Sequence, residues 1–197
     1  MIYVPKNLPK KYTAVFIVAV AQSVYDEVVT TQQILNKMEL DNTAYNRKLI
    51  NQGIGYIIDN ELIIGKKVKS NRYCLYRKEI SLDSKEYYSI DYKYINSIIK
   101  IKDRCNRLDL INYFLIIYNT INHYSHVGFT SIETLSKRAD CTVASIIKYN
   151  RILQDNHILF IATSKKQGIS NRYGLYKDKE SIIKEAKKAG IWIDNTN

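Results

Sequence analysis

Cysteine and histidine are scarce in this 197-residue chain, which contains three of each. Cys74, Cys105 and Cys141 are an odd number at wide spacing, and the sequence has no Cys-x-x-Cys pair and no histidines placed to complete a zinc site. We therefore expect buried, reduced thiols. The same shortage predicts that the protein binds no metal and no other cofactor.

Motifs for catalysis are missing as well. The sequence has no glycine-rich phosphate loop ending in Gly-Lys-Ser/Thr, no His-Glu-x-x-His, no Gly-x-Ser-x-Gly and no paired acidic cluster on adjacent strands. The stretch from His123 to His126 has no carboxylate or thiol at a spacing that completes a ligand set. The many tyrosines leave open a tyrosine nucleophile of the kind found in nicking or recombining enzymes. Those enzymes normally surround the tyrosine with several Arg and His residues, and His is scarce here. We expect no enzymatic activity.

No long hydrophobic run is present. The longest early apolar run, residues 12–21, is shorter than the roughly 20 residues that a membrane helix needs, and no small-residue cleavage site follows it. We therefore expect a cytoplasmic protein that does not enter a membrane.

Positive charge, in contrast, is abundant. Lys and Arg number 30 against 19 Asp and Glu, which gives a net charge of +11 and a pI near 9.4. This excess predicts a polyanionic partner.

One seven-residue phrase occurs twice. SNRYCLY at Ser70–Tyr76 returns as SNRYGLY at Ser170–Tyr176, 100 positions later. That spacing is too wide for a solenoid, whose units recur every ~20–50 residues. Half the chain is long enough to close a small core of its own, so the repeat predicts two copies of one small domain.

The second half shows the pattern of a helix-turn-helix followed by a hairpin. Residues 131–138 predict a short helix that begins at Thr130 or Ser131, and residues 143–153 predict a second helix after a turn. Positions 143, 146, 147, 150 and 153 would form its inner face. Strands at 157–162 and 171–176 would enclose a basic loop, which is the order of a winged helix.

The first half follows the same order. Thr30 can cap a helix over residues 31–38, and Asp41-Asn42 would form the turn and cap the second helix, residues 43–52. Strands at 61–64 and 71–76 would flank a cationic loop. One more apolar helix precedes each pair, near residues 10–24 and 108–122. The repeated phrase would then mark the third-strand edge of each wing.

These elements predict a mainly α protein with small β-wings, of the α+β class. Neither Pro nor Gly occurs between Val68 and Val127, so the connector between the domains should be helical and fairly stiff. The expected parts are two winged-helix domains at 8–80 and 105–180, a connector at 81–104 and a C-terminal basic helix at 181–190.

The stretch Ser145–Leu159, together with the Asn-Arg-Tyr strand after it, resembles the winged helix-turn-helix proteins carried by plasmids, phages and conjugative elements of low-GC Gram-positive bacteria. The resemblance covers residues 107–190 well and residues 10–77 loosely. In that group such modules serve replication initiators and transcriptional regulators, so the resemblance implies a fold rather than one task. This chain departs from the usual pattern where Asn156-His157 replaces a helix-ending glycine.

Candidate DNA contacts fall at the start of each recognition helix, in each hairpin loop and at one Arg at the base of each hairpin. Asn, Ser, Thr and Lys can bond base edges, Ala admits a thymine methyl, and Lys and Arg reach phosphates or a narrow minor groove. The alternatives are an ordinary solvated helix face, solubilising lysines and an Arg that covers the sheet edge. The candidates are Thr43, Tyr45, Asn46, Lys48, Lys66, Lys67, Lys69, Arg72, Thr142, Ala144, Ser145, Lys148, Tyr149, Lys165, Lys166 and Arg172.

We therefore expect a sequence-specific binder of double-stranded DNA that reads two unlike half-sites, as a transcriptional regulator of a mobile element associated with the bacterial nucleoid. A replication initiator that binds iterated origin sites is the alternative, followed by a protein-interaction scaffold and a single-strand binder. Tyr73, Tyr76, Tyr173 and Tyr176 should pack in cores, which disfavours the last. A homodimer through the connector or the C-terminal helix stays open.

Overall fold

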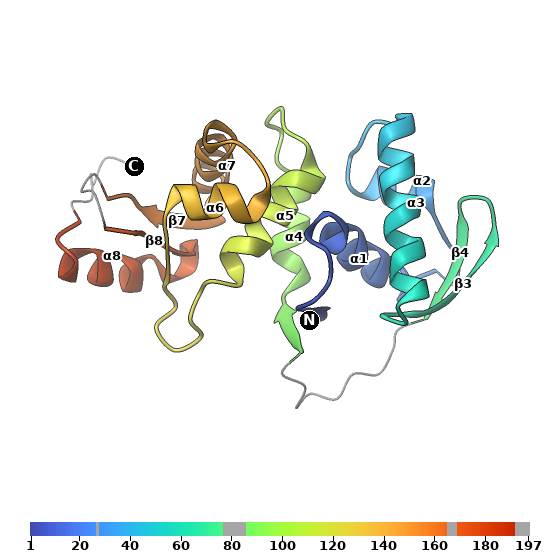
Figure 1. Cartoon of the computed structure of the whole chain (residues 1–197), viewed down its shortest axis with the longest axis horizontal. Coiled ribbons are helices and arrows are strands. Elements are labelled where there is room, and N and C mark those ends of the chain that lie inside the picture. Colours follow the sequence, from blue (N-terminus) through green and yellow to red (C-terminus); the bar gives the residue numbers. More distant parts are fainter. Residues whose placement is uncertain (27, 77–85, 165–168, 192–197) are drawn as a thin grey trace. The chain divides into compact units, whose positions relative to one another are not determined.

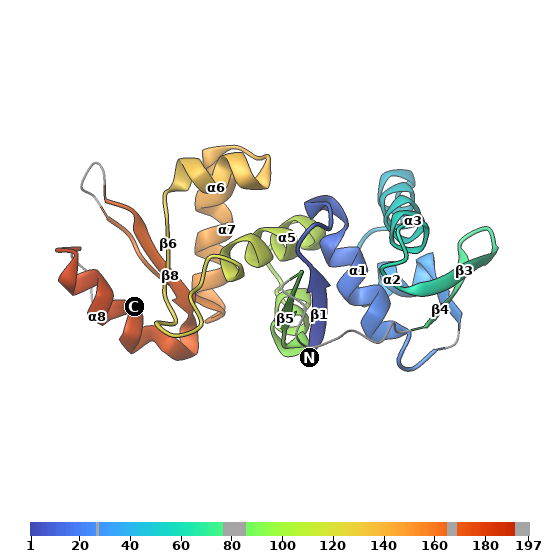
Figure 2. The ribbon, with the colours of Figure 1, turned by 60° about the horizontal axis from the view of Figure 1, so that its bottom comes forward.

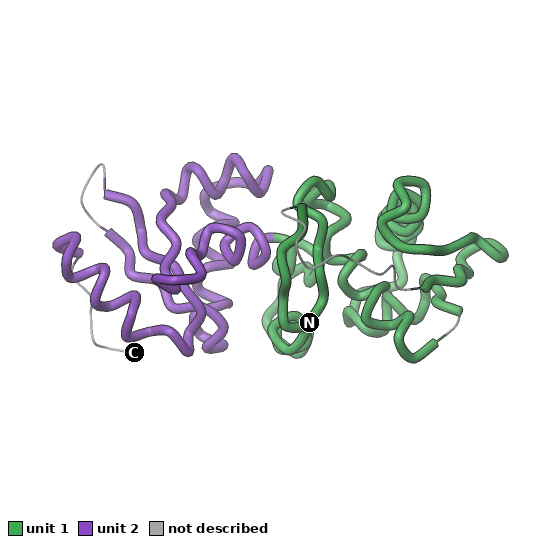
Figure 3. The backbone as a smooth tube through the Cα atoms, turned by 90° about the horizontal axis from the view of Figure 1, so that it is seen from below, with its two compact units in different colours: residues 1–112 green, residues 113–197 purple. Residues whose placement is uncertain are grey.

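The computed structural model describes residues 1–26, 28–76, 86–164 and 169–191. It is a mixed α and β structure with small antiparallel sheets (Figure 1). The chain divides into two compact units, Met1–Asn112 (unit 1) and Tyr113–Asn197 (unit 2), which are coloured separately in Figure 3. The boundary falls inside one helix, α5 (Arg107–Tyr118).

The two units repeat one order of elements: helix, short strand, two helices and a hairpin. In unit 1 these are α1 (Lys10–Gln22), β2 (Val28–Thr30), α2 (Thr31–Lys37), α3 (Ala44–Asp59), β3 (Ile64–Lys69) and β4 (Arg72–Tyr76). After α5 the order returns as β6 (Gly128–Thr130), α6 (Ile132–Ala139), α7 (Val143–Asp155), β7 (Leu159–Ala162) and β8 (Asn171–Leu175). A 3-10 turn (Tyr176–Asp178) and α8 (Lys179–Lys188) follow.

Hydroxyl side chains cap four of the helices: α2, α3, α6 and α7. Thr30 accepts a hydrogen bond from Gln33 N while the Gln33 side chain accepts one from Thr30 N, so both orphan donors are satisfied. Ser131 caps α6 in the same role, accepting from Thr134 N. The cap of α3 is Thr43, one residue beyond the turn predicted to supply it.

The repeated phrase forms the central strand of each sheet, and its prediction as the edge of each wing is wrong. The strand orders are β2-β4-β3 and β6-β8-β7, so β4 and β8 are paired on both sides. In these two sheets, the strands that the sequence did not reveal are β2 and β6. Each has three residues, which is too short to show an alternating pattern.

Polar residues of the phrase join the sheet of unit 1 to α3. Asn51 of α3 accepts hydrogen bonds from Thr31 Oγ1 (2.5 Å) and Tyr73 Oη (3.0 Å), and its Nδ2 donates to Asn71 Oδ1 (2.8 Å). Burial raises the pKa of Tyr73, so its hydroxyl remains a proton donor across the physiological range. Tyr73 itself is buried, as predicted.

Replacing Asn51 by Ala should therefore destabilise unit 1 by about 1–3 kcal/mol, because the hydroxyls of Thr31 and Tyr73 lose their shared acceptor. Urea unfolding followed by circular dichroism measures the change. Gln52→Ala is the control, since its side chain is exposed on the same helix. Equal unfolding midpoints for the two variants would contradict the role given to Asn51.

Unit 2 carries a related network. Asn171 Nδ2 donates to Tyr173 Oη (3.1 Å), and Tyr113 Oη donates to Asn150 Oδ1 of α7 (2.5 Å). Burial raises the pKa of Tyr173, although its hydrogen bonds with Asn171 and Asn150 act in the opposite direction. Tyr173 is buried, whereas its neighbour in the phrase, Tyr176, is only half-buried and the matching Tyr76 is 53% exposed. The core prediction thus fails for Tyr76.

Unit 2 has a helix on the second face of its sheet. Tyr173 faces α7, and the next residue, Gly174, faces α8, so the sheet lies between the two helices (Figure 2). Ile182 and Ala186 of α8 are buried there together with Val127 and Ala162. The predicted C-terminal helix is therefore confirmed, and its apolar side is occupied within unit 2. Gly190 ends it with φ 66°, as its position predicts.

The connector is not simply helical. Residues 77–85 lie outside the described part, and β5 (Tyr87–Ile90) then pairs antiparallel with β1 (Ile2–Pro5) before α4 (Tyr92–Ile99) begins. Tyr-Tyr-Ser-Ile is a strand-forming stretch whose partner lies at the other end of unit 1, so its pairing is not visible locally. Ile95, Ile98 and Ile99 bury one side of α4.

Candidate nucleic-acid interface

The first two turns of α3 present an exposed, cationic side. Tyr45 is 68% exposed, and Arg47 and Lys48 are exposed beside it. Thr43 precedes them and uses its hydroxyl to accept from Asn46 N (3.1 Å). Arg47 was not among the predicted contacts, although it adjoins Lys48 and falls outside the inner positions of the helix.

Asn46 does not lie on that side. Its side chain is 8% exposed, and its Nδ2 donates to Asp41 O (2.9 Å), which closes the turn between α2 and α3. The prediction that Asn46 reads an adenine edge is therefore not supported by this geometry. A buried amide is expected to have its hydrogen bonds satisfied internally, and this one does.

The start of α7 has a more apolar exposed side. Thr142 caps the helix, accepting from Ser145 N (3.2 Å), and Ala144 and Lys148 are exposed. Val143 and Ile147 are 42% and 54% exposed, so their prediction as inner-face residues is wrong. Tyr149 is half-buried, with its ring 5.4 Å from that of Tyr113, and so belongs to the packing rather than to the open surface.

The two helices match position by position when 100 is added to the number. Asn46 and Ile146 are both buried, as are Ile50 and Asn150. By this correspondence Arg47 and Ile147 occupy the same outward position. The equivalent surfaces therefore differ in charge at this position.

Electrostatics at both helix starts favour an anion. Neither α3 nor α7, each described in full, has an acidic residue in its first turn. The only carboxylates of these helices are Asp59 and Asp155, both at the last residue. Helix N-termini carry a partial positive charge that acidic residues commonly complement. At α3 and α7 no first-turn carboxylate offsets this charge, so it favours an anion.

The hairpin of unit 1 differs from its prediction. Lys66, Lys67 and Lys69 lie within β3, not in a loop tip, because α3 continues to Asp59 and β3 begins only at Ile64. All three are exposed, and so is Arg72 at the start of β4. The turn of this hairpin and the N-terminal end of α3 point the same way in Figure 1.

Strand register separates these cations onto two faces. Lys67 lies opposite Tyr73, whose buried side chain bonds to α3, so Lys67 is on the α3 side of the sheet. Lys66 lies opposite Cys74 and Lys69 opposite Arg72, both on the other face. Neighbouring lysines of β3 thus serve different surfaces.

The matching hairpin of unit 2 offers less free charge. Arg172 is half-buried: its guanidinium lies 4.6 Å from the centre of the Phe129 ring and donates to Ser170 O. This geometry supports the alternative that Arg172 covers the sheet edge. The predicted contacts Lys165 and Lys166 lie outside the described residues.

A groove of about 890 Å³ runs beside α7 in unit 2. Its helix wall includes Ile147 and Arg151, and its strand wall includes Phe160 and Thr163. The side chain of Arg151 is 83% exposed, and its Nε lies 3.5 Å from Asp155 Oδ2. The sequence prediction did not include Arg151, whose position one turn after Ile147 is the signal that would have found it.

The chain matches no protein-family model, and no curated protein is significantly similar to it.

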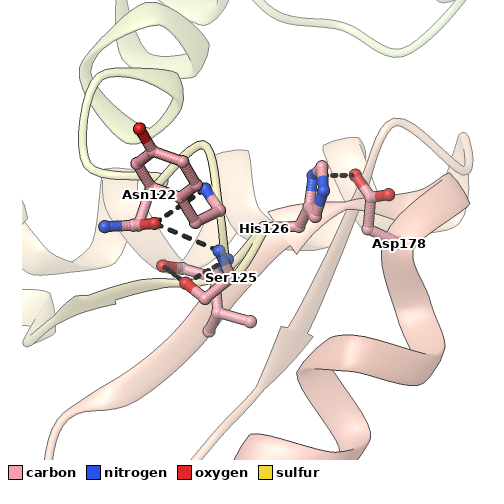
Figure 4. Close-up of polar contacts among 6 residues, drawn as sticks. Asn122, Ser125, His126 and Asp178 are labelled. Atoms are coloured by element: carbon pink, nitrogen blue, oxygen red, sulfur yellow. Dashed lines mark hydrogen bonds and ion pairs between the residues drawn. The ribbon is translucent and has the colours of Figure 1, made fainter.

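The histidine-containing turn has a structural explanation (Figure 4). Asn122 Oδ1 accepts from Tyr124 N (2.8 Å) and Ser125 N (3.1 Å), which folds the turn. His126 Nδ1 lies 3.7 Å from Asp178 Oδ2, a carboxylate that sequence spacing did not reveal. Among the described residues, no three His, Cys, Asp or Glu side chains gather closely enough to hold a metal ion.

Two further predictions can be placed. Within the described part of the chain, Cys74, Cys105 and Cys141 form no disulfide, but each residue is half-buried rather than buried. The apolar run at residues 12–21 belongs to α1, whose residues Tyr12 to Val20 are all buried in unit 1. Within the described ranges, no helix has both the length and the apolar character to cross a membrane.

Proposed function

We propose that this chain consists of two tandem winged-helix domains that bind double-stranded DNA and regulate transcription, with α3 and α7 as the recognition helices. The observation that carries the proposal is a twice-repeated arrangement: a capped helix, exposed on one side of its N-terminal half and free of acidic residues there, lies beside a three-stranded sheet. Helices of this kind enter the major groove with their first residues at the base edges.

Each exposed side chain suits a contact of known chemistry. Tyr45, Arg47 and Lys48 of α3 can reach phosphates or guanine, and Ala144 and Ile147 of α7 can meet thymine methyl groups. Lys67, on the α3 side of the sheet, would contact the backbone, whereas Lys69 and Arg72 lie on the other face. The net charge of +11 supports a partner with dense negative charge.

A double variant tests the unit 1 surface. Lys48→Ala/Lys67→Ala should weaken binding to a mixed-sequence duplex and lower the slope of log K against log salt by about 2, because two phosphate contacts are lost. Lys184→Ala/Lys187→Ala removes the same charge from exposed positions of α8 and is the control. Fluorescence anisotropy over a range of salt concentrations gives both slopes. An equal loss of slope in the control would show that the effect is one of net charge alone.

Footprinting separates the regulator from a replication initiator. A regulator should protect sites that overlap a promoter and leave the duplex closed, whereas an initiator should bind iterated sites and distort an adjoining AT-rich segment. Permanganate, which oxidises unpaired thymines, reports the difference on the same footprint. Reactive thymines beside clustered repeats would replace transcriptional regulation with replication initiation.

A further inference from the structure

The sheet of unit 1 has an outer face that points away from α3. Tyr73 is buried and bonds to α3, so its strand neighbours Arg72 and Cys74 face the other way, together with Tyr76. Register adds the residues opposite them: Ile64 pairs with Tyr76, Lys66 and Val28 both pair with Cys74, and Lys69 and Thr30 both pair with Arg72. We call this surface the outer face; it is formed by Val28, Thr30, Ile64, Lys66, Lys69, Arg72, Cys74 and Tyr76.

The outer face is open and has two parts. At one end Ile64 and Tyr76 are directly paired across the strands, and they are 58% and 53% exposed. Towards the hairpin turn, Lys66, Lys69 and Arg72 are all exposed. An apolar patch joined to a cluster of like charges is unusual for a surface that only meets water, because both features favour a partner.

In unit 2 the corresponding face holds a helix. Gly174 occupies the position of Cys74, and a Cβ added there would lie 2.6 Å from Ile182 Cδ1 of α8. Phe160 pairs with Gly174 as Lys66 pairs with Cys74, and Ala162 pairs with Arg172 as Lys69 pairs with Arg72. A sheet of this topology therefore accepts a helix on this face, although the register of β3 against β4 shifts between Lys67 and Lys69.

The side chains that differ between the two faces indicate the charge of a helix that would bind to the outer face. Lys66 and Lys69 stand where unit 2 has Phe160 and Ala162, and no carboxylate is among the residues of the outer face. Among the described residues, none forms an ion pair with Lys66, Lys69 or Arg72. Like charges this close repel one another, and an acidic partner would relieve that repulsion.

Helices of this chain do not fit the outer face. The helix α4, which repeats the Ser-Ile-Ile-Lys sequence of α8, lies by β5 and α5 and away from β3 and β4 (Figures 1 and 2). The helix α8 of a second copy carries four lysines against two glutamates, and its apolar side already covers its own sheet. A duplex held on α3 would lie on the other side of the sheet from Lys66 and Ile64.

We propose that the outer face of unit 1 docks an acidic amphipathic helix of a partner protein. The apolar stripe of that helix packs on Val28, Ile64, Cys74 and Tyr76, while its carboxylates pair with Lys66, Lys69 and Arg72. Because Cys74 replaces Gly174, a residue smaller than Ile182 should fit best above it. This site is separate from α3, so partner and DNA can be bound together.

The test uses a designed probe on the full chain. The probe is a fluorescent peptide with the sequence of residues 179–190, its lysines changed to Glu, and a staple on its outer side that holds it helical. We expect saturable binding that is at least about tenfold tighter than that of a stapled peptide with the same composition in scrambled order. Amide shifts in NMR spectra should be confined to Val28, Lys66, Cys74 and their strand neighbours.

Variants on the two faces give a crossed pattern. Lys66→Glu should weaken binding of the peptide at least about fivefold, and Lys67→Glu should weaken it less than about twofold. Binding of duplex DNA should be weakened more by Lys67→Glu than by Lys66→Glu. Cys74→Gly should increase the affinity for the peptide, because removing the Cys74 side chain makes room for the peptide residue that corresponds to Ile182. The proposal fails if the scrambled peptide binds equally well. It also fails if the same variant, Lys66→Glu or Lys67→Glu, has the larger effect on the binding of both the peptide and DNA. Absence of duplex binding by the unmodified chain would overturn the proposed function and leave this site untouched.

Discussion

Gly174→Cys should destabilise unit 2 by about 3 kcal/mol, which is the upper part of the range for overpacked cores. This substitution gives unit 2 the seven-residue sequence of unit 1, SNRYCLY. A Cβ at Gly174 would lie 2.6 Å from Ile182 Cδ1 and 2.7 Å from His126 O. Side chains can rotate away from such a contact, but His126 O is backbone in a turn fixed by Asn122. The variant should therefore push α8 from the sheet and expose the cluster of Ile182, Ala186 and Ala162.

The reverse exchange is the matched control. Cys74→Gly gives unit 1 the phrase of unit 2. The described residues place no such helix on this face of unit 1, and Cys74 is half-buried. Its cost should be that of a glycine in a strand, about 0.5–1 kcal/mol. Hydrogen exchange measures the two units separately, since loss of α8 packing should raise exchange in β7, β8 and α8 only. Equal costs for the two exchanges would contradict the assignment of Gly174 as the seat of α8.

Arg107→Ala should have a still larger effect, about 3–5 kcal/mol, on unit 1. The Arg107 side chain is 8% exposed and donates to the carbonyls of Ile99 (3.3 Å), Asp103 (2.8 Å), Cys105 (3.1 Å) and Ile101. These carbonyls end α4 and line the turn before α5, so the guanidinium closes the last turn of one helix and the entry to the next. Its removal leaves the buried carbonyls of Ile99 and Ile101 without this donor.

Two further variants separate the donors from the charge. Arg107→Lys keeps the charge but cannot present the guanidinium fork, so we expect it to recover less than half of the loss. Arg151→Ala, from an exposed i,i+4 ion pair on α7, should cost less than about 0.5 kcal/mol. Urea unfolding gives all three values. A full recovery by Lys would mean that charge, and not the set of carbonyl contacts, holds this segment.

Local signals in the sequence predicted the helix starts well. Thr30, Ser131 and Thr142 each precede a stretch of apolar periodicity, and a hydroxyl cap is decided by neighbours three residues away. The end of α3 was not predictable in the same way. Gly53 and Gly55 suggest a stop, but a Cβ at Gly53 would lie 3.1 Å from Val15 Cγ1, so Gly53 is there for packing against α1. That contact joins segments far apart in the chain.

The candidate site shows the same division. Exposure of Tyr45 and Lys48 follows from helical periodicity, whereas burial of Asn46 and exposure of Ile147 depend on partners that a helical wheel does not contain. Lys66, Lys67 and Lys69 were found by composition, but their faces follow from pairing with β4. Arg107 gives no sequence signal at all, because its acceptors are backbone carbonyls.

The salt dependence of binding to duplex DNA tests the central claim most directly. The full chain should bind a mixed-sequence duplex of about 30 base pairs at micromolar concentrations or below at low salt, and log K should fall linearly with log salt as counterions are released. A slope that corresponds to several phosphate contacts is the predicted result. Failure to bind the duplex at low salt, or an affinity that salt does not change, would contradict DNA binding by this chain.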